Sequence, residues 1–279
     1  MKKLTVFCAA ACLAASAAAQ NHPDLHEVLD RQKGRNLIEI PKGTYTLDVR
    51  NNGPYKFHNL TDVHINGNGS TVICNNQEQA FSFYNCVRVE LRDLTIDYDP
   101  LCFTQGEITA VAEDGSWFDV RIDEGYPVTG LAANRVQFYD PQTRLLKRNS
   151  ITTYTSNYSA LKQLGHNLFR AVKNGTWSAG EQVGDLVVMD VKTDKPNAGV
   201  HTVMLNKCYN TKLENVTVYG SNTFSFFEKE GYANEYRNCV VDRGPMPQGI
   251  RPRLRSGNAD GIHSSQARKG PTVTGCKVG

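Results

Sequence analysis

The residues best suited to catalysis lie near the carboxyl end, in the run Asn-Ala-Asp-Gly-Ile-His-Ser-Ser that begins at Asn258. On a strand, Asn258 and Asp260 point to the same side, and the small Ala259 between them suits a crowded interior. Gly261 permits a bend that returns His263 to the outer face beside Asp260. An exposed carboxyl beside a histidine fits acid–base handling of a sugar, whereas the competing interpretation has Asp260 capping a turn and Asn258 in a polar ladder.

Glycoside hydrolysis needs a second carboxyl, which activates water or attacks the sugar carbon. Asp242, on the preceding predicted repeat, is the best remaining candidate in the chain, and Glu228 and Glu230 are weaker ones. Hydrolysis at this site would therefore need Asp260 together with a second carboxyl, for which Asp242 is the first choice.

Three arginines alternate just before this run, at Arg251, Arg253 and Arg255. One strand face would then carry three positive charges, which could bind an acidic sugar as in a polysaccharide lyase. A solvated edge that discourages strand pairing is the favoured interpretation. The candidate catalytic residues are thus Asp260 and Asp242, and the candidate substrate-binding residues are Asn258, His263, Arg255 and Glu228.

Several other conspicuous side chains receive a structural interpretation. Phe224, Phe226 and Phe227 are expected to stack in the core rather than to form a sugar platform. His201 and His166 lie in apolar segments, and we expect them to be structural histidines rather than bases.

Neither a metal nor a cofactor is expected. No CxxC pair or Cys/His cluster has the spacing of a zinc site, and Asp97, Asp99 and Asp123 lack the spacing of a calcium loop. An exported chain with an even number of cysteines permits disulfides, but a ladder of buried free thiols is favoured. Outside the leader described below, the cysteines are Cys74, Cys86, Cys102, Cys208, Cys239 and Cys276.

An internal repeat indicates the elements that position these residues. Residues 86–98 align without a gap with residues 208–220, so that Leu91 matches Leu213 and Asp93 matches Asn215. Each copy is a short strand of alternating apolar residues closed by Gly, Asn or Asp turn chemistry. Strands this short bury their apolar side by stacking on neighbouring copies. We therefore expect an all-β chain built as a right-handed parallel β-helix, which is a solenoid.

Two segments of the chain depart from this repeat, one at the amino end of the solenoid and one within it. Residues 23–32 place Leu25, Val28 and Leu29 on one face of a helix that caps the first coil and prevents edge pairing there. Residues 101–200 break the repeat, and a hairpin with its turn at Asp114-Gly115 predicts a small inserted β-barrel or sandwich. The expected divisions are a leader (1–19), the cap and first coils (20–100), the insertion (101–200) and further coils (201–279).

Composition and the amino terminus limit the class of protein. The chain has 279 residues, a formal net charge of +3, 40% hydrophobic residues and scattered basic residues, so no nucleic-acid footprint is present. Lys2 and Lys3, an apolar stretch and small residues before Gln20 form a secretory leader, with cleavage expected near Ala19. No apolar run is long enough for a membrane span. We expect an exported protein, secreted or periplasmic, whose partner is a carbohydrate.

The quoted runs support a resemblance to a known family. The leader, the helix cap, the run Ile-Pro-Lys-Gly-Thr-Tyr from Ile40, the run Ile-Asp-Tyr-Asp-Pro-Leu-Cys-Phe from Ile96 and the run from Asn258 resemble bacterial pectin-lyase-like β-helix proteins. The chain is most similar to glycoside hydrolase family 110, the α-1,3-galactosidases, whose members also carry an inserted β-barrel. The run Asn-Ala-Asp-Gly is similar as well to the Asn-Thr-Asp-Gly run of family 28 polygalacturonases.

The resemblance implies inverting hydrolysis of α-linked galactosides or related glycans, with Asp260 as a catalytic carboxyl, most simply the proton donor, and with Asn258 and His263 lining the sugar subsite. Both families supply further aspartates from the next coil, but no aspartate follows Asp260 here. We expect the chain to be a C-terminally truncated fragment, which could be inactive. A non-catalytic glycan-binding β-helix and a polysaccharide lyase are the alternatives.

Overall fold

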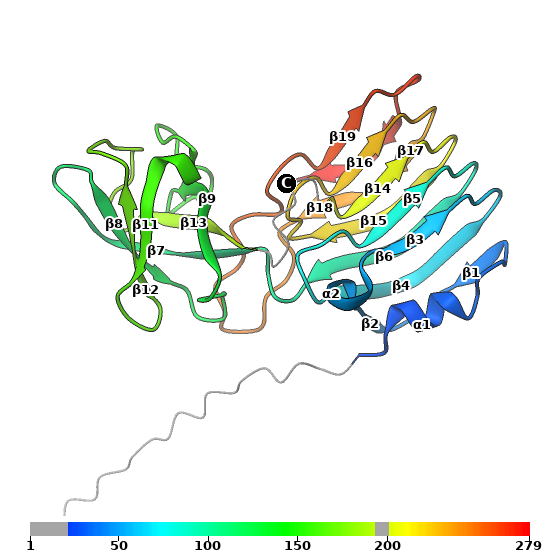
Figure 1. The fold of residues 1–279 in the computed structure, drawn as a ribbon, viewed down its shortest axis with the longest axis horizontal. Helices are drawn as coiled ribbons and strands as arrows, with labels where there is room; N and C mark the ends of the chain where they lie inside the picture. The colour runs from blue at the N-terminus through cyan, green and yellow to red at the C-terminus, as the bar shows by residue number, and fades with distance from the viewer. Residues whose placement is uncertain (1–21, 193–200) are drawn as a thin grey trace, which may run out of the picture.

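The computed structural model describes residues 22–192 and 201–279, and within them the chain is mostly β (Figure 1). The predicted leader and its cleavage point near Ala19 lie outside the described residues. The helices among the described residues are short: α1 (Leu25–Asp30), α2 (Val49–Asn52) and one 3-10 turn (Thr155–Asn157). No helix in these two ranges is both long and apolar enough to cross a membrane.

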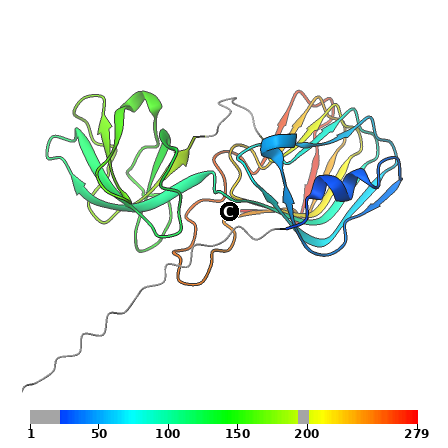
Figure 2. The same cartoon turned by 60° about the horizontal axis from the view of Figure 1, so that its bottom comes forward.

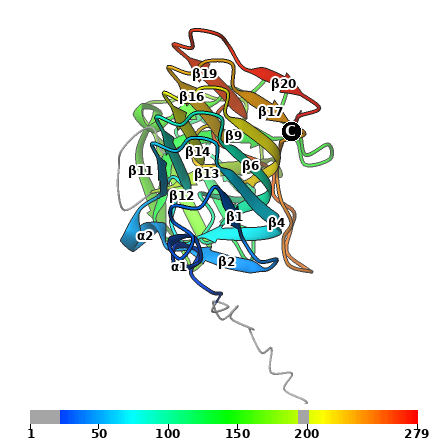
Figure 3. The same cartoon turned by 90° about the vertical axis from the view of Figure 1, so that its right-hand side faces the viewer.

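Two parallel sheets form one half of the molecule (Figures 1 and 3). In the larger sheet the order is β1-β4-β6-β15-β17-β20, with β2 beside β4 and with β18 between β15 and β21. In the smaller sheet the order is β19-β16-β14-β5-β3. Both sheets add strands in chain order from coil to coil, which is consistent with a β-helix-like fold.

Most strands of these sheets are short, as the repeat predicted, although β4, β6 and β15 have 11, 9 and 8 residues. The larger sheet contains β1 (Leu37–Glu39), β2 (Thr44–Leu47), β4 (His64–Cys74), β6 (Glu90–Tyr98), β15 (Lys212–Tyr219), β17 (Glu235–Arg237), β18 (Val240–Asp242), β20 (Thr272–Thr274) and β21 (Lys277–Val278). The smaller sheet contains β3 (Tyr55–His58), β5 (Phe81–Tyr84), β14 (Val203–Asn206), β16 (Phe226–Lys229) and β19 (Ile262–Ser265).

The register of β6 and β15 agrees with the alignment of the two sequence repeats. Leu213 lies beside Leu91 in the parallel pair, although the two copies are far apart in the chain. Asp93 and Asn215 form the same bend in both strands, with φ angles of 56° and 53°. The Asn215 amide donates to Asp93 Oδ1 at 2.8 Å, so the bend is stabilised from coil to coil.

One hydrophobic core runs through the parallel region and includes the first helix. Leu25, Val28 and Leu29 of α1 are buried in it, as the helical spacing predicted. All six cysteines among the described residues are free thiols, and each of them except the partly exposed Cys276 is buried. The predicted buried thiols are therefore confirmed, since small sulfur side chains fill the interior as apolar groups.

The other half of the molecule is an antiparallel sheet with a second, separate core (Figure 2). Its order, β10-β9-β13-β7-β8-β12-β11, curls into a nearly closed, barrel-like shape. The predicted hairpin is confirmed, with Gly115 at φ 74° in its turn. The strands are β7 (Phe103–Val111), β8 (Trp117–Ile122), β9 (Leu131–Tyr139), β10 (Thr153–Tyr154), β11 (Tyr158–Gln163), β12 (Leu168–Lys173) and β13 (Leu186–Val191).

Residues 243–261, which we call the junction loop, run between the two halves (Figure 2). Arg253 makes two bonds of 2.8 Å to the Asp97 carboxylate at the end of β6, and Arg255 bonds to Asp190 of β13 at 2.8 Å. Both arginines are about 5% exposed or less. The expectation of a solvated, charged edge is therefore wrong for these two residues, because each guanidinium is buried against a carboxylate.

Candidate functional site

A pocket of about 650 Å³ lies where the junction loop meets the antiparallel sheet. Arg135, Gln137 and Tyr139 of β9 form one wall, and they share a face because side chains alternate along a strand. Leu145 and Leu146 are exposed at its edge. Arg243 and residues 254–260 of the junction loop line another part of the pocket.

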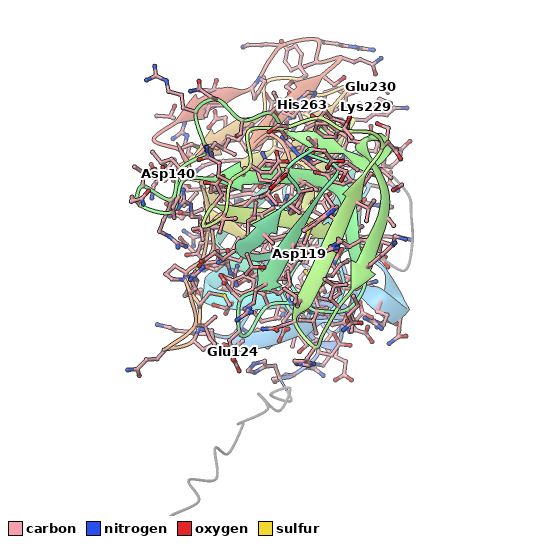
Figure 4. The ribbon with its side chains drawn as sticks, turned by 90° about the vertical axis from the view of Figure 1, so that its left-hand side faces the viewer. Asp119, Glu124, Asp140, Lys229, Glu230 and His263 are labelled. Carbon is pink, nitrogen blue, oxygen red and sulfur yellow. The ribbon has the colours of Figure 1, made fainter. Side chains whose placement is uncertain are left out.

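Asp260 and His263 meet at this site as the sequence predicted. His263 Nδ1 lies 2.8 Å from Asp260 Oδ2, and Asp260 lines the pocket. The Asp260 side chain is 62% exposed and the His263 side chain 37% exposed, so both are accessible. Figure 4 shows His263 at the same end of the molecule as Lys229 and Glu230. A solvent-accessible carboxyl paired with an imidazole can accept or donate a proton.

The backbone around these residues differs from the expectation. Asn258 and Asp260 lie in the junction loop rather than on a strand, because β19 begins only at Ile262. The Asp260 carbonyl still accepts the Ser225 N–H at 3.2 Å, which continues the ladder towards the preceding coil. The loop therefore holds the two side chains at the pocket without strand alternation.

Asn258 and Arg255 form a polar network at the pocket wall. Asp190 accepts from Arg255 at 2.8 Å and from the Asn258 amide at 3.2 Å. Arg255 also donates to Asn258 Oδ1 at 3.2 Å, and Arg135 of β9 donates to the Asn258 carbonyl. Both predicted residues thus line the pocket, but their polar groups are engaged by the protein and hold the loop against the antiparallel sheet.

Asp242 does not line the pocket, although its neighbour Arg243 does. Its carboxylate lies 2.5 Å from Lys277 Nζ and accepts the Arg243 N–H at 2.7 Å. The hydrogen bond from Lys277 is the main cause that lowers the pKa of Asp242. Asp242 is therefore held as a charged partner of Lys277, and the structure does not bring it together with Asp260.

Glu228 is sealed inside the parallel region and is fully buried. On β16 it pairs with Leu205 of β14, which in turn pairs with Phe83 of β5. Both of these side chains are buried, so the Glu228 side chain also points inward. The Asn234 amide donates to it at 2.9 Å and the Ser264 hydroxyl at 2.8 Å. The predicted contact with substrate is not supported, because burial and two internal hydrogen bonds give Glu228 a structural place.

An aromatic cluster on the outer face was missed by the sequence analysis. The ring of Phe224 stacks on His263 at 4.2 Å and on His201 at 4.8 Å, and Phe227 lies 5.6 Å from His263. Phe226 is fully buried, whereas Phe224 and Phe227 are partly exposed. The expectation that all three are core residues was wrong for two, and strand alternation at 226 and 227 was the available signal.

His201 is a structural histidine, as expected. It is 9% exposed and its Nδ1 lies 2.9 Å from the Thr223 hydroxyl. Burial is the main cause that lowers its pKa to about 4. The ring is therefore neutral near pH 7 and cannot serve as a cationic contact. His166, in contrast, is exposed, so the apolar setting expected for it is wrong.

The pocket wall formed by Arg135, Gln137 and Tyr139 was also missed, because no group of residues in 101–200 had a pattern typical of a catalytic site. Their i, i+2, i+4 spacing indicated that they share one face of a strand. Nothing in the sequence indicated that the junction loop packs beside this face. Over residues 22–192 and 201–279, no group of three or more His, Cys, Asp or Glu side chains could hold a metal ion.

Comparison with known proteins gives no family for this chain. No family model and no curated protein matches it. Among solved structures it is similar to the tailspike protein gp49 from Pseudomonas phage LKA1, at 12% sequence identity and a TM-score of 0.25. The matched part covers 86% of this chain and 36% of the tailspike chain, so this chain spans about a third of that protein.

Proposed function

We propose that the parallel region is a right-handed β-helix capped by α1, with the antiparallel sheet as an insertion. Parallel pairing in chain order supports the helix, and the shared core supports the cap. The proposed divisions remain residues 20–100, 101–200 and 201–279, after a leader that is removed near Ala19. Export to the periplasm or beyond is part of the same proposal.

We propose that the protein binds a glycan in the junction pocket and cleaves a glycosidic bond there. The observation that carries the proposal is the Asp260 carboxyl on the wall of a pocket of about 650 Å³, within 2.8 Å of His263. A pocket of this volume has room for sugar rings and opens beside a proton-transfer pair. Asp260 is assigned as the donor of a proton to the leaving oxygen.

Hydrolysis with inversion, which the resemblance implies for α-linked galactosides, also needs a carboxylate that activates water about 6.5–9.5 Å from the acid. Asp242 is the proposed second residue, since it directly precedes the pocket residue Arg243. Its bond to Lys277 must open before it can serve as a base.

The test is cleavage of an α-1,3-linked galactobiose, with the anomeric configuration of the released galactose followed by NMR. We expect an inverted product, and we expect Asp260→Asn to lower kcat by about 10²- to 10⁴-fold, the usual contribution of a general acid. Glu124→Gln is the matched control, because Glu124 is an exposed carboxylate that does not line the pocket.

The remaining outcomes separate the mechanisms. Loss of activity in Asp242→Asn supports the two-carboxylate mechanism, and full activity removes Asp242 from it. A product that absorbs in the ultraviolet through a new double bond indicates a lyase. Turnover that survives in Asp260→Asn overturns the assignment of the proton donor.

A second candidate is glycan binding without catalysis. It is favoured by one observation: among the described residues, Asp260 is the only carboxylate side chain that lines the pocket. Saturable binding of the disaccharide with no release of galactose from the wild-type protein would establish this candidate instead.

A further inference from the structure

The side chains that line the junction pocket carry an excess of positive charge. Arg135 projects from β9, and Arg243 and Arg255 come from the junction loop. Against these three guanidinium groups, the lining within residues 22–192 and 201–279 offers one carboxylate side chain, Asp260, which pairs with His263. The pocket therefore presents more cationic donors than anionic acceptors.

The three arginines differ in how far the protein satisfies them. Arg255 has a carboxylate partner, because Asp190 lies 2.8 Å away. Arg135 bonds to Asn258, which is uncharged. The Arg243 guanidinium makes no ion pair or hydrogen bond with any described residue. Two of the three charges thus lack a carboxylate partner among the described residues.

Two of these arginines also carry buried donors that are unsatisfied. The Nε atoms of Arg135 and Arg255 are buried and have no hydrogen-bond partner among the described residues. A buried donor without an acceptor is unfavourable by about 1–3 kcal/mol. A cluster with uncompensated positive charge beside an open pocket is suited to receive an anion.

The neighbouring arginines outside the pocket show that this excess is local. Arg253 is matched to Asp97 at 2.8 Å, and Arg251 lies 3.1 Å from Asp123 and 3.4 Å from Glu107. Elsewhere, therefore, β6, β7 and the segment after β8 supply carboxylates to the arginines of the junction loop. At the pocket, the arginines that line it adjoin open volume and few acceptors.

We propose that the pocket binds a sugar that carries an oxyanion, either the carboxylate of a uronic acid or a sulfate ester. Arginine recognises both groups through paired N–H···O bonds, with Arg243 as the leading contact and Arg135 as the second. The inference rests on the proposed glycan site and names its class of substrate. It departs from the neutral α-linked galactosides of the family to which the sequence is most similar.

The experiment compares ligands that share one ring. Galacturonate, galactose 6-sulfate and galactose are titrated separately into the full chain by calorimetry at pH 7. We expect at least one of the two anionic sugars to bind about tenfold or more tightly than galactose, the effect of one charge-assisted contact. The affinity should fall as salt is added, since part of the attraction is electrostatic.

Variants assign the contact to Arg243. Arg243→Gln should weaken binding of the anionic sugar about tenfold and leave that of galactose unchanged, while Arg243→Lys should retain part of the preference. Arg121→Gln is the matched control, because Arg121 is an exposed arginine of β8 that does not line the pocket. The melting temperature of each variant shows whether the fold is retained.

The outcomes also separate the two sources of the anion. A preference for galacturonate alone points to a uronic acid, and a preference for the sulfate alone points to a sulfated glycan. Equal affinity for galactose and both anionic sugars overturns the inference, as does the absence of anionic-sugar binding at millimolar concentration. Anion binding without any bond cleavage upholds this inference while it overturns the proposed catalysis.

Discussion

The parallel region and the antiparallel sheet are built on different principles. In the parallel region, equivalent residues of successive coils lie side by side, as Leu91 and Leu213 do, and every coil adds to one continuous core. In the antiparallel sheet, hairpins and long-range pairs close around a second core with its own members. The two cores share no residue within the described chain.

The junction loop joins these regions mainly through polar contacts. Arg253 binds the end of β6 in the parallel region, and Arg255 binds β13 in the antiparallel sheet. Leu254, between them, is buried in the antiparallel core. The comparison teaches that hydrophobic burial stabilises each region separately, while buried ion pairs hold the two together and shape the pocket.

The largest expected effect tests whether the two cores unfold independently. Phe138 lies in the antiparallel core and Phe83 in the parallel core, and both are buried. Each change to alanine should lower the free energy of unfolding of its own region by about 4 kcal/mol, through lost burial and a cavity. Both tryptophans of the chain, Trp117 and Trp177, lie in the antiparallel half.

Urea unfolding followed by tryptophan fluorescence therefore reports on the antiparallel region, and far-ultraviolet circular dichroism reports on both. Phe138→Ala should shift the fluorescence midpoint, whereas Phe83→Ala should shift chiefly the dichroism midpoint. Equal shifts of both signals in each variant would show a single cooperative unit instead of two.

A somewhat smaller effect is expected from the ion pair that joins the regions. Arg253→Met leaves the buried Asp97 without its partner and should lower the free energy of unfolding by about 3 kcal/mol. Unlike the phenylalanine variants, this one should shift fluorescence and dichroism together.

Two variants serve as controls for that experiment. Arg237→Met removes an exposed pair with Glu235 and should change the free energy of unfolding by less than about 1 kcal/mol. The double change Arg253→Met with Asp97→Leu should recover much of the loss, because it removes the stranded charge. No difference between Arg253→Met and Arg237→Met contradicts the joining role.

The smallest expected effect concerns pH and belongs to the parallel region. Burial lowers the pKa of His201 to about 4, below an ordinary value of 6.5. Between these pH values the unfolded chain binds a proton that the folded protein does not. Stability from this group is present above pH 6.5 and is lost as pH falls towards 4, with about 2 kcal/mol lost by pH 5.

His201→Phe keeps an aromatic ring against Phe224 but removes the titration. It should flatten the dependence of the dichroism midpoint on pH between 7 and 4. His166→Phe, at an exposed position, should leave that dependence as in the wild type. An unchanged pH profile in His201→Phe would assign the acid sensitivity to other groups.

Local patterns predicted much of the fold. The helical spacing of Leu25, Val28 and Leu29 and the aligned repeats around Leu91 and Leu213 depend on contacts within a short segment or between similar segments. Such patterns are set by burial on one face, which the sequence records directly.

The site was predicted less completely, for physical reasons that differ between residues. Asp260 and His263 meet because three positions separate them. The contact of Arg255 with Asp190 spans 65 positions and joins two different structures, so no local pattern encodes it. A glutamate is usually expected on the surface. Glu228, however, lies two positions after the buried Phe226 on the same strand, so both side chains point to the interior.

The pairing of β6 with β15 has a consequence for engineering and for evolution. The bend residues Asp93 and Asn215 are bonded to each other although 122 positions separate them. The stacked coils therefore continue in step across the intervening segment, which enters and leaves the stack at neighbouring points. The segment between β6 and β14 can be replaced by a short linker or by a foreign domain while the stacked coils keep their pairing. The stacked coils and the β9 wall of the pocket can thus change independently during evolution.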